Sequence, residues 1–167
     1  SRTIIFSDKE ECRYQSLINT IPLPELFKLF EAPSAVQEAV DNLRYNSILC
    51  VNLGIHHENI NDNHWIYYPE AQYPFFRISF LKNFASYLVP EGKSSITAEI
   101  AYSPSRPINM ETIADETVNA LMEAKIIQHR DQIDLIDLQD VQYGYVIFDH
   151  KRVASLEIIK SFLNEHG

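Results

Sequence analysis

The chain has 167 residues, of which 46% are hydrophobic and 22% charged, and its formal net charge is −9. This length and composition are typical of one globular domain. The acidic balance, without a cluster of cations, argues against a nucleic-acid partner. The sequence contains no run of 18 apolar residues and does not open on a signal segment, so no membrane span is predicted.

Several classes of site are not predicted. The four glycines form no Gly-x-Gly-x-x-Gly or Walker-type phosphate loop. The six histidines lack a metal-ligand spacing, so no metal site is expected. No serine or cysteine lies in a nucleophile elbow, and no catalytic residue is assigned. Cys12 and Cys50 lie far apart, and Cys50 falls in an apolar run, which favours a buried free thiol and a cytoplasmic location.

The first 42 residues predict a β-hairpin followed by two short helices. The β-prone segments are residues 3–7 and 12–19, joined by a charged turn. Pro24 suits the first turn of a helix, because its missing N–H costs nothing there. Ser34 is expected to cap a second helix over residues 35–42. The apolar face of the first helix would comprise Leu26, Phe27, Leu29 and Phe30.

The middle of the chain predicts two strands and a helix. Residues 45–55 are nearly continuously apolar, which indicates a central strand covered on both faces. Residues 94–102 alternate, which indicates a half-buried strand with Glu99 on its polar side. Asn109 is expected to cap a helix that ends near residue 124. The apolar stripe of that helix would comprise Met110, Ile113, Ala114, Val118, Leu121 and Met122.

The last third predicts extended segments at residues 131–141 and 143–148, and then a helix over 151–165. A bulge is expected between Leu135 and Ile136, because the apolar face switches there. The buried positions of the closing helix would be Leu156, Ile159, Phe162 and Leu163. The element order predicts an α+β fold with a mostly antiparallel mixed sheet and three to five helices. Both ends read as cut, so residues 1–167 are expected to be a single domain of a longer protein.

Residues 64–80 form the most distinctive segment, with the only tryptophan, three tyrosines, three phenylalanines and one arginine. Strict alternation would place Arg77 with Phe75 away from the core, and Phe76 with Ile78 inside it. One interpretation is an aromatic hairpin whose surface arginine lies over Phe75. The other is the wall of a ligand pocket, because a guanidinium binds phosphate or carboxylate oxygens bidentately.

Four aromatic residues leave a similar choice. Trp65 and Tyr67 would share one side of a strand, as a stacking surface with a hydroxyl or as a plain cross-strand aromatic pair. Gly144 lies between Tyr143 and Tyr145. A glycine inside a strand indicates either a bulge or the close approach of a backbone or ligand.

Several of these segments together resemble one group of enzymes. Residues 17–26 (Leu-Ile-Asn-Thr-Ile-Pro-Leu-Pro-Glu-Leu) are similar to a strand-to-helix segment of FAD-dependent oxidoreductases of the amine oxidase and protoporphyrinogen oxidase type. Residues 65–70 (Trp-Ile-Tyr-Tyr-Pro-Glu), followed by 74–77 (Pro-Phe-Phe-Arg) and Asn83, resemble a hairpin of UDP-galactopyranose mutases. Residues 109–127, with residues 143–150 (Tyr-Gly-Tyr-Val-Ile-Phe-Asp-His) after them, fit the same order.

The resemblance implies that the chain is the excised substrate-binding domain of a flavoprotein. FAD is expected in the parent protein, in a Rossmann domain that this chain lacks and on which it would pack. The fragment alone is expected to hold no cofactor and to be inactive. By matching position, Tyr67, Arg77 and Tyr145 would hold the diphosphate of a nucleotide sugar, and Trp65 and Asn83 also match family positions.

Two further alternatives stay open. Val146 follows Tyr145 where the mutases have proline, so a UDP-galactopyranose mutase, which is an isomerase, and an amine oxidase-like oxidoreductase both remain. A free-standing, non-enzymatic α+β module that binds a protein or a small ligand is the second alternative.

Overall fold

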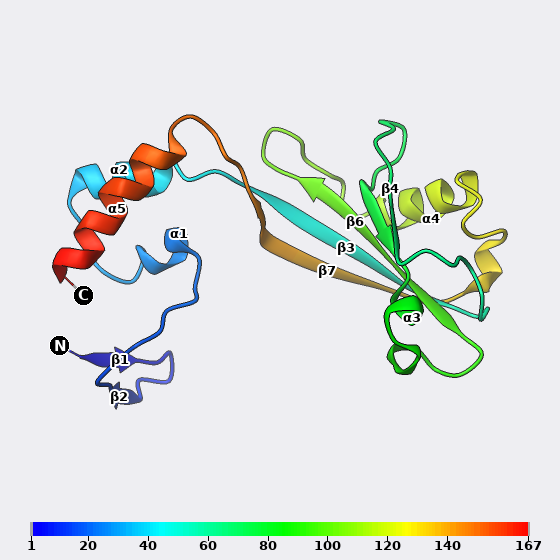
Figure 1. The fold of residues 1–167 in the computed structure, drawn as a ribbon, viewed down its shortest axis with the longest axis horizontal. Helices are drawn as coiled ribbons and strands as arrows, with labels where there is room; N and C mark the ends of the chain where they lie inside the picture. The colour runs from blue at the N-terminus through cyan, green and yellow to red at the C-terminus, as the bar shows by residue number, and fades with distance from the viewer. Residues whose placement is uncertain (1, 167) are drawn as a thin grey trace. The chain divides into compact units, whose positions relative to one another are not determined.

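The computed structural model describes residues 2–166, which divide into two compact units (Figure 1). The first unit is formed by the segments up to Leu43 and from Lys151 onward, and the second is Arg44–His150. Within residues 2–166, no helix has the length and apolar character needed to cross a membrane.

The first unit begins with a two-stranded sheet. β1 (Thr3–Ile5) and β2 (Glu11–Arg13) pair antiparallel, with Ile4 opposite Cys12. The predicted hairpin is therefore confirmed, although its second strand ends at Arg13 and not at residue 19.

Three helices follow in this unit: α1 (Leu23–Leu26), α2 (Ser34–Asp41) and α5 (Arg152–His166). Ile159 of α5 is fully buried in a cluster with Phe27 and the apolar side of α2. Leu156, Phe162 and Leu163, predicted as buried, are only half-buried.

Two predictions for this unit are wrong. Pro33 precedes α2 and its carbonyl accepts hydrogen bonds from the N–H groups of the first turn, so Ser34 lies inside the helix and is not its cap. α1 ends at Leu26, and the turn that follows buries Phe27 but leaves Leu29 exposed. The apolar residues of this segment therefore do not form one helical face.

The second unit contains a five-stranded, fully antiparallel sheet with the order β4-β5-β6-β3-β7. The strands are β3 (Tyr45–Ile55), β4 (Trp65–Tyr67), β5 (Arg77–Ser79), β6 (Ser94–Tyr102) and β7 (Ile133–Val146). Short helices α3 (Leu81–Phe84), η1 (Ser86–Leu88) and η2 (Arg130–Gln132) lie in the connections. The bounds predicted for β3 and β6 and the α+β class are confirmed.

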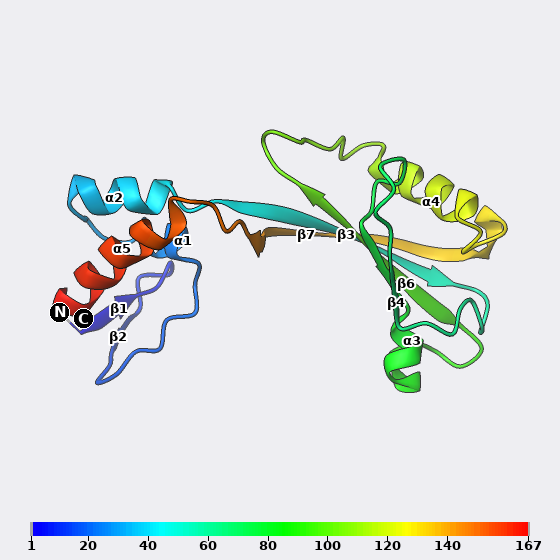
Figure 2. The ribbon, with the colours of Figure 1, turned by 45° about the horizontal axis from the view of Figure 1, so that its top comes forward.

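One face of this sheet is covered by α4 (Ile113–Glu123), as Figures 1 and 2 show. Alternate residues of β3 and β6 form the core with α4, and they include Leu49, Val51, Leu53, Ile96, Ala98, Ile100, Val118 and Leu121. The opposite face carries half-buried Cys50 and Asn52. We call it the open face. β3 is therefore not buried on both faces as predicted, because α4 covers one face and Cys50 and Asn52 on the other face are only half-buried.

The start of α4 also differs from the prediction. Asn109 Oδ1 accepts a hydrogen bond from the N–H of Glu111, at 3.0 Å, and the helix begins only at Ile113. Asn109 thus opens a turn ahead of the helix. Met110 lies in that turn and is exposed, so it does not belong to the buried stripe.

β7 is one strand, and its irregularities lie elsewhere than predicted. Leu135 and Ile136 pair regularly with Gly54 and Leu53, so the bulge expected between them is absent. The register shifts instead after Ile133 and between Val141 and Tyr145. At the second shift, Val141 faces Ile48 and Tyr145 faces Asn46. Between these two pairs, β7 therefore contains two more residues than β3.

Candidate functional site

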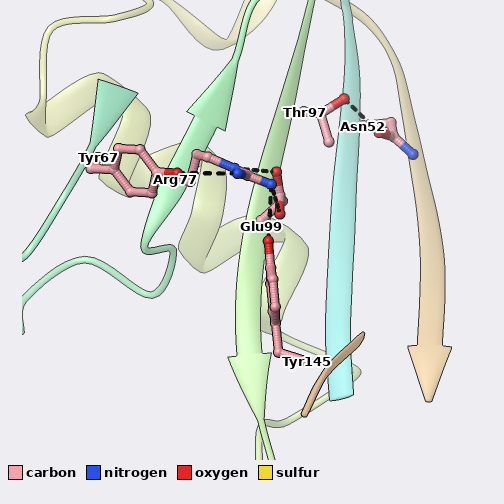
Figure 3. Close-up of polar contacts among 6 residues, drawn as sticks. All are labelled: Asn52, Tyr67, Arg77, Thr97, Glu99 and Tyr145. Atoms are coloured by element: carbon pink, nitrogen blue, oxygen red, sulfur yellow. Dashed lines mark hydrogen bonds and ion pairs between the residues drawn. The ribbon is translucent and has the colours of Figure 1, made fainter. Parts of the chain in front are cut away.

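Four polar side chains from four strands converge on the open face of the sheet (Figure 3). Arg77 donates from Nε to Oε1 of Glu99 and from Nη2 to Oε2, both at 2.6 Å. Its Nη1 donates to the hydroxyl of Tyr67 at 3.2 Å, and Nη2 also donates to the hydroxyl of Tyr145 at 3.4 Å. We call Tyr67, Arg77, Glu99 and Tyr145 the Arg77 cluster.

Strand register places three of these residues in one row. Tyr67 of β4 lies directly opposite Arg77 of β5, which lies directly opposite Glu99 of β6. Residues that face each other across an antiparallel pair have Cβ atoms about 4.5–5.5 Å apart, so their side chains meet on the same face. Sequence reasoning missed Glu99 as a site residue. The alternation of residues 94–102 placed Glu99 on the polar side of β6, but it did not indicate that Arg77 would be the partner of Glu99.

Tyr145 reaches the cluster through the irregular part of β7. The sheet order separates β7 from β5 by two strands. At Gly144 the backbone passes so close to β3 that an added Cβ would lie 2.3 Å from Cγ1 of Ile48. The two extra residues of β7 before Tyr145 change the path of the strand, and the Tyr145 hydroxyl accepts a hydrogen bond from the guanidinium of Arg77. Both readings of Gly144, a bulge and a close backbone approach, are confirmed.

The predicted sidedness of the two phenylalanines before Arg77 is wrong. Phe75 is 1% exposed and belongs to the core. Phe76 lies on the side of Arg77, with its ring centre 5.8 Å from the guanidinium carbon. Regular β5 begins only at Arg77, so the alternation does not extend back to residue 75. Ile78 is buried opposite Arg77, as expected.

Trp65 and Asn83, the other two candidate residues, make different contacts. The half-exposed Trp65 ring stacks on Phe84, with ring centres 5.7 Å apart and planes at 22°. Asn83 donates from Nδ2 to the backbone carbonyls of Asn61 and Asn63, at 2.7 and 2.6 Å. Asn83 therefore ties the loop before β4 to α3.

The cluster holds one compensated positive charge. Burial disfavours the charged guanidinium, but the hydrogen bonds to Glu99 and Tyr67 outweigh this effect and raise the pKa of Arg77. Both tyrosine oxygens accept hydrogen bonds from Arg77, so each hydroxyl keeps its own proton as a donor. The cluster can thus direct two O–H groups at the oxygen atoms of a ligand.

The Cys50 thiol lies next to this cluster on the open face. Cys50 is directly opposite Glu99 on one side and Gln139 on the other. The thiol is free, as predicted, but half-buried rather than buried. Burial raises its pKa, the charge of Glu99 raises it further, and Arg77 opposes both effects.

We expect the thiol of Cys50 to be alkylated more slowly at about pH 8 than an ordinary cysteine, because a raised pKa leaves less thiolate. Glu99→Gln removes the charge that raises this pKa and should shift the rate profile to lower pH. Mass spectrometry of iodoacetamide labelling, in a Cys12→Ser background, measures the rate. An identical pH profile in both proteins would show that Glu99 does not act on Cys50.

Residues 2–166 contain no group of three or more histidine, cysteine, aspartate or glutamate side chains that could hold a metal ion. The chain also lacks a glycine-rich phosphate loop of the usual dinucleotide-binding kinds. The residues present therefore do not fit an FAD pyrophosphate site.

A cleft of about 790 Å³ lies in the second unit, and its lining includes Tyr102, Asp140 and residues of the loop 103–107 but no member of the Arg77 cluster. Tyr102 follows Ile100 in the alternation, so it lies on the core side of the sheet. Its hydroxyl donates to Asp140 at 2.6 Å, and this hydrogen bond raises the pKa of Tyr102. We place the candidate site at the Arg77 cluster, because charged and hydroxyl groups from four strands converge there.

No family model matches the chain. A crystal structure of reduced UDP-galactopyranose mutase is similar, with a TM-score of 0.87 and 24% identity, over 98% of this chain and 36% of that chain. This chain shares its fold with that part of the mutase.

Two other solved structures are similar at lower scores. A candidate protoporphyrinogen oxidase from Exiguobacterium has a TM-score of 0.68 and 12% identity, over 88% of this chain and 33% of that one. An oxidoreductase from Methanosarcina mazei has a TM-score of 0.64 and 13% identity, over 86% and 37%. The chain spans about a third of the length of these proteins. The fold expected from the sequence resemblance is therefore confirmed.

Proposed function

We propose that the chain is the substrate-binding part of an FAD-dependent enzyme, and that the substrate lies against the open face at the Arg77 cluster. The observation that carries the proposal is the meeting of Tyr67, Arg77 and Tyr145 through hydrogen bonds. The mutase-like fold over 98% of the chain supports it. FAD would be held by residues outside this chain, which would pack on it.

The chemistry of the cluster favours a UDP-galactopyranose mutase-like substrate, a nucleotide sugar whose diphosphate accepts hydrogen bonds. Tyr67 and Tyr145 keep their protons for such oxygens, while Arg77 orients both hydroxyls. Glu99 already compensates the charge of Arg77, so directed hydrogen bonds and not net positive charge would hold the diphosphate. Binding should therefore depend only weakly on salt. In an amine oxidase-like enzyme, the same face would position an amine or a hydrocarbon.

Calorimetric titration of the full-length, FAD-loaded protein with UDP-galactose tests this proposal. Arg77→Ala should weaken binding by about 10- to 100-fold, because it releases both tyrosine hydroxyls and leaves the Glu99 carboxylate without its cation beside the diphosphate. Tyr67→Phe and Tyr145→Phe should each weaken it by about 2- to 10-fold. Tyr87→Phe, at an exposed tyrosine outside the cluster, is the matched control and should have no effect.

Two results would reject parts of the proposal. An unchanged affinity of Arg77→Ala for UDP-galactose would show that the Arg77 cluster is not part of the substrate site. A wild-type protein that binds no UDP-sugar would reject the mutase-like version. The reading frame of the parent gene distinguishes the free-standing module from both enzymes. A flavoprotein requires a glycine fingerprint for FAD, so a parent sequence without one outside this chain would favour the module.

A further inference from the structure

A second row of hydrogen-bonded polar side chains crosses the open face beside the Arg77 cluster, and Figure 3 shows two of its members, Thr97 and Asn52. The hydroxyl of Thr97 donates to Oδ1 of Asn52 at 2.9 Å. The Nδ2 atom of Asn52 donates to Oδ2 of Asp137 at 3.4 Å. The row thus links β6, β3 and β7, and Asp137 is exposed at its end.

The two rows are neighbours on one face. Thr97 is two residues from Glu99 on β6, and Asn52 is two residues from Cys50 on β3. Alternate residues of a strand point to the same face, about 7 Å apart along it. Asp137 lies directly opposite Asn52 and therefore shares this face. One extended ligand on the open face can contact both rows.

The chemistry of the second row differs from that of the Arg77 cluster. Asn52 has a second amide hydrogen beyond the one directed at Asp137, and the carboxylate accepts several hydrogen bonds. Among residues 2–166, no lysine, arginine or histidine forms a salt bridge with Asp137. A carboxylate without a cation repels phosphate, but it accepts hydrogen bonds from hydroxyl groups. The Asn52 amide beside this carboxylate can donate to the oxygen of the same hydroxyl group or of a neighbouring hydroxyl group.

We propose that Thr97, Asn52 and Asp137 contact the hydroxyl groups of a neutral, polyhydroxylated part of the substrate, whose anionic part lies against the Arg77 cluster. This inference rests on the proposed function and adds residues that determine specificity. In this proposal the part at the second row is the transferred sugar and not the ribose of the nucleotide, so Asn52 and Asp137 would favour a sugar-bearing nucleotide over the bare nucleotide diphosphate.

The test compares the affinities of the full-length, FAD-loaded protein for UDP and for UDP-galactose by calorimetry. Asn52→Leu and Asp137→Ala should each weaken UDP-galactose binding by about 3- to 10-fold and leave UDP binding unchanged. Asp137→Asn should retain most of the affinity, because its amide oxygen still accepts from a hydroxyl. Glu123→Ala, at an exposed carboxylate of α4, is the matched control and should change neither affinity. Melting temperatures check that every variant is folded.

The outcomes separate this inference from the proposed function. Equal losses for UDP and UDP-galactose, or no loss for either, would overturn the role of the second row while the Arg77 cluster stands. A loss in Asp137→Asn as large as in Asp137→Ala would show that the carboxylate binds a cation such as an amine, and would overturn the hydroxyl assignment. A wild-type protein that binds neither ligand would overturn the proposed function and this inference with it.

Discussion

Gly144→Ala is expected to destabilise the second unit by about 1–3 kcal/mol, the usual cost of overpacking a filled site. The new Cβ would lie 2.3 Å from Cγ1 and 3.1 Å from the backbone nitrogen of Ile48. Ile48 is itself buried, so β7 would have to move away from β3. Urea unfolding of the chain, followed by the fluorescence of Trp65, its only tryptophan, measures the change.

Gly54→Ala is the matched control for this substitution. Its added Cβ would lie 3.4 Å from Cβ of Leu135, which is an ordinary contact at the same strand pair. We expect it to be neutral or to stabilise by up to about 1 kcal/mol, because alanine restricts the unfolded chain. If Gly144→Ala were as stable as Gly54→Ala, the close approach of β7 to β3 would be contradicted. In the full-length protein, Gly144→Ala should also weaken UDP-galactose binding, because it displaces Tyr145.

Glu99→Leu is expected to cost about 2–4 kcal/mol of stability. It leaves the guanidinium of Arg77, whose side chain is 25% exposed, without its two strongest hydrogen bonds. Loss of one partner of a fully buried pair costs about 3–5 kcal/mol, and the residual exposure of Arg77 reduces that figure. With Glu99 present, Arg77→Lys should not preserve the interaction, because an ammonium cannot form the bidentate contact.

A double-mutant cycle isolates the Arg77–Glu99 interaction. Arg77→Met combined with Glu99→Leu should cost less than the sum of the single changes, because neither charge is then left unpaired. The same Trp65 unfolding assay measures all four proteins. Additive effects would mean that the two side chains do not stabilise each other.

The parts of the fold that depend on local patterns could be predicted. The bounds of β3 and β6 follow from a continuous apolar run and a strict alternation, which are properties of the segments themselves. Arg77 was correctly assigned away from the core by its alternation with Ile78. Alternation failed at Phe75 and Phe76, because the regular strand begins only at Arg77.

The contacts between distant segments could not be predicted in this way. Glu99 lies 22 residues from Arg77, and their pairing depends on the register of β6 against β5. Tyr145 reaches the same guanidinium through a register shift. Gly144 indicated an irregularity there, but no local pattern indicated that it would bring Tyr145 to Arg77. The resemblance to flavoenzymes named Tyr67, Arg77 and Tyr145, but it did not name Glu99, which orients the guanidinium.

Hydrogen–deuterium exchange of the full-length, FAD-loaded protein, with and without UDP-galactose, tests the central claim most directly. The claim is that substrate lies against the open face at the Arg77 cluster. We expect ligand-dependent protection in β5, in β6 near Glu99 and in β7 near Tyr145. Protection confined to the loop at residues 103–107 and the cleft around Tyr102, with none in these strands, would contradict it.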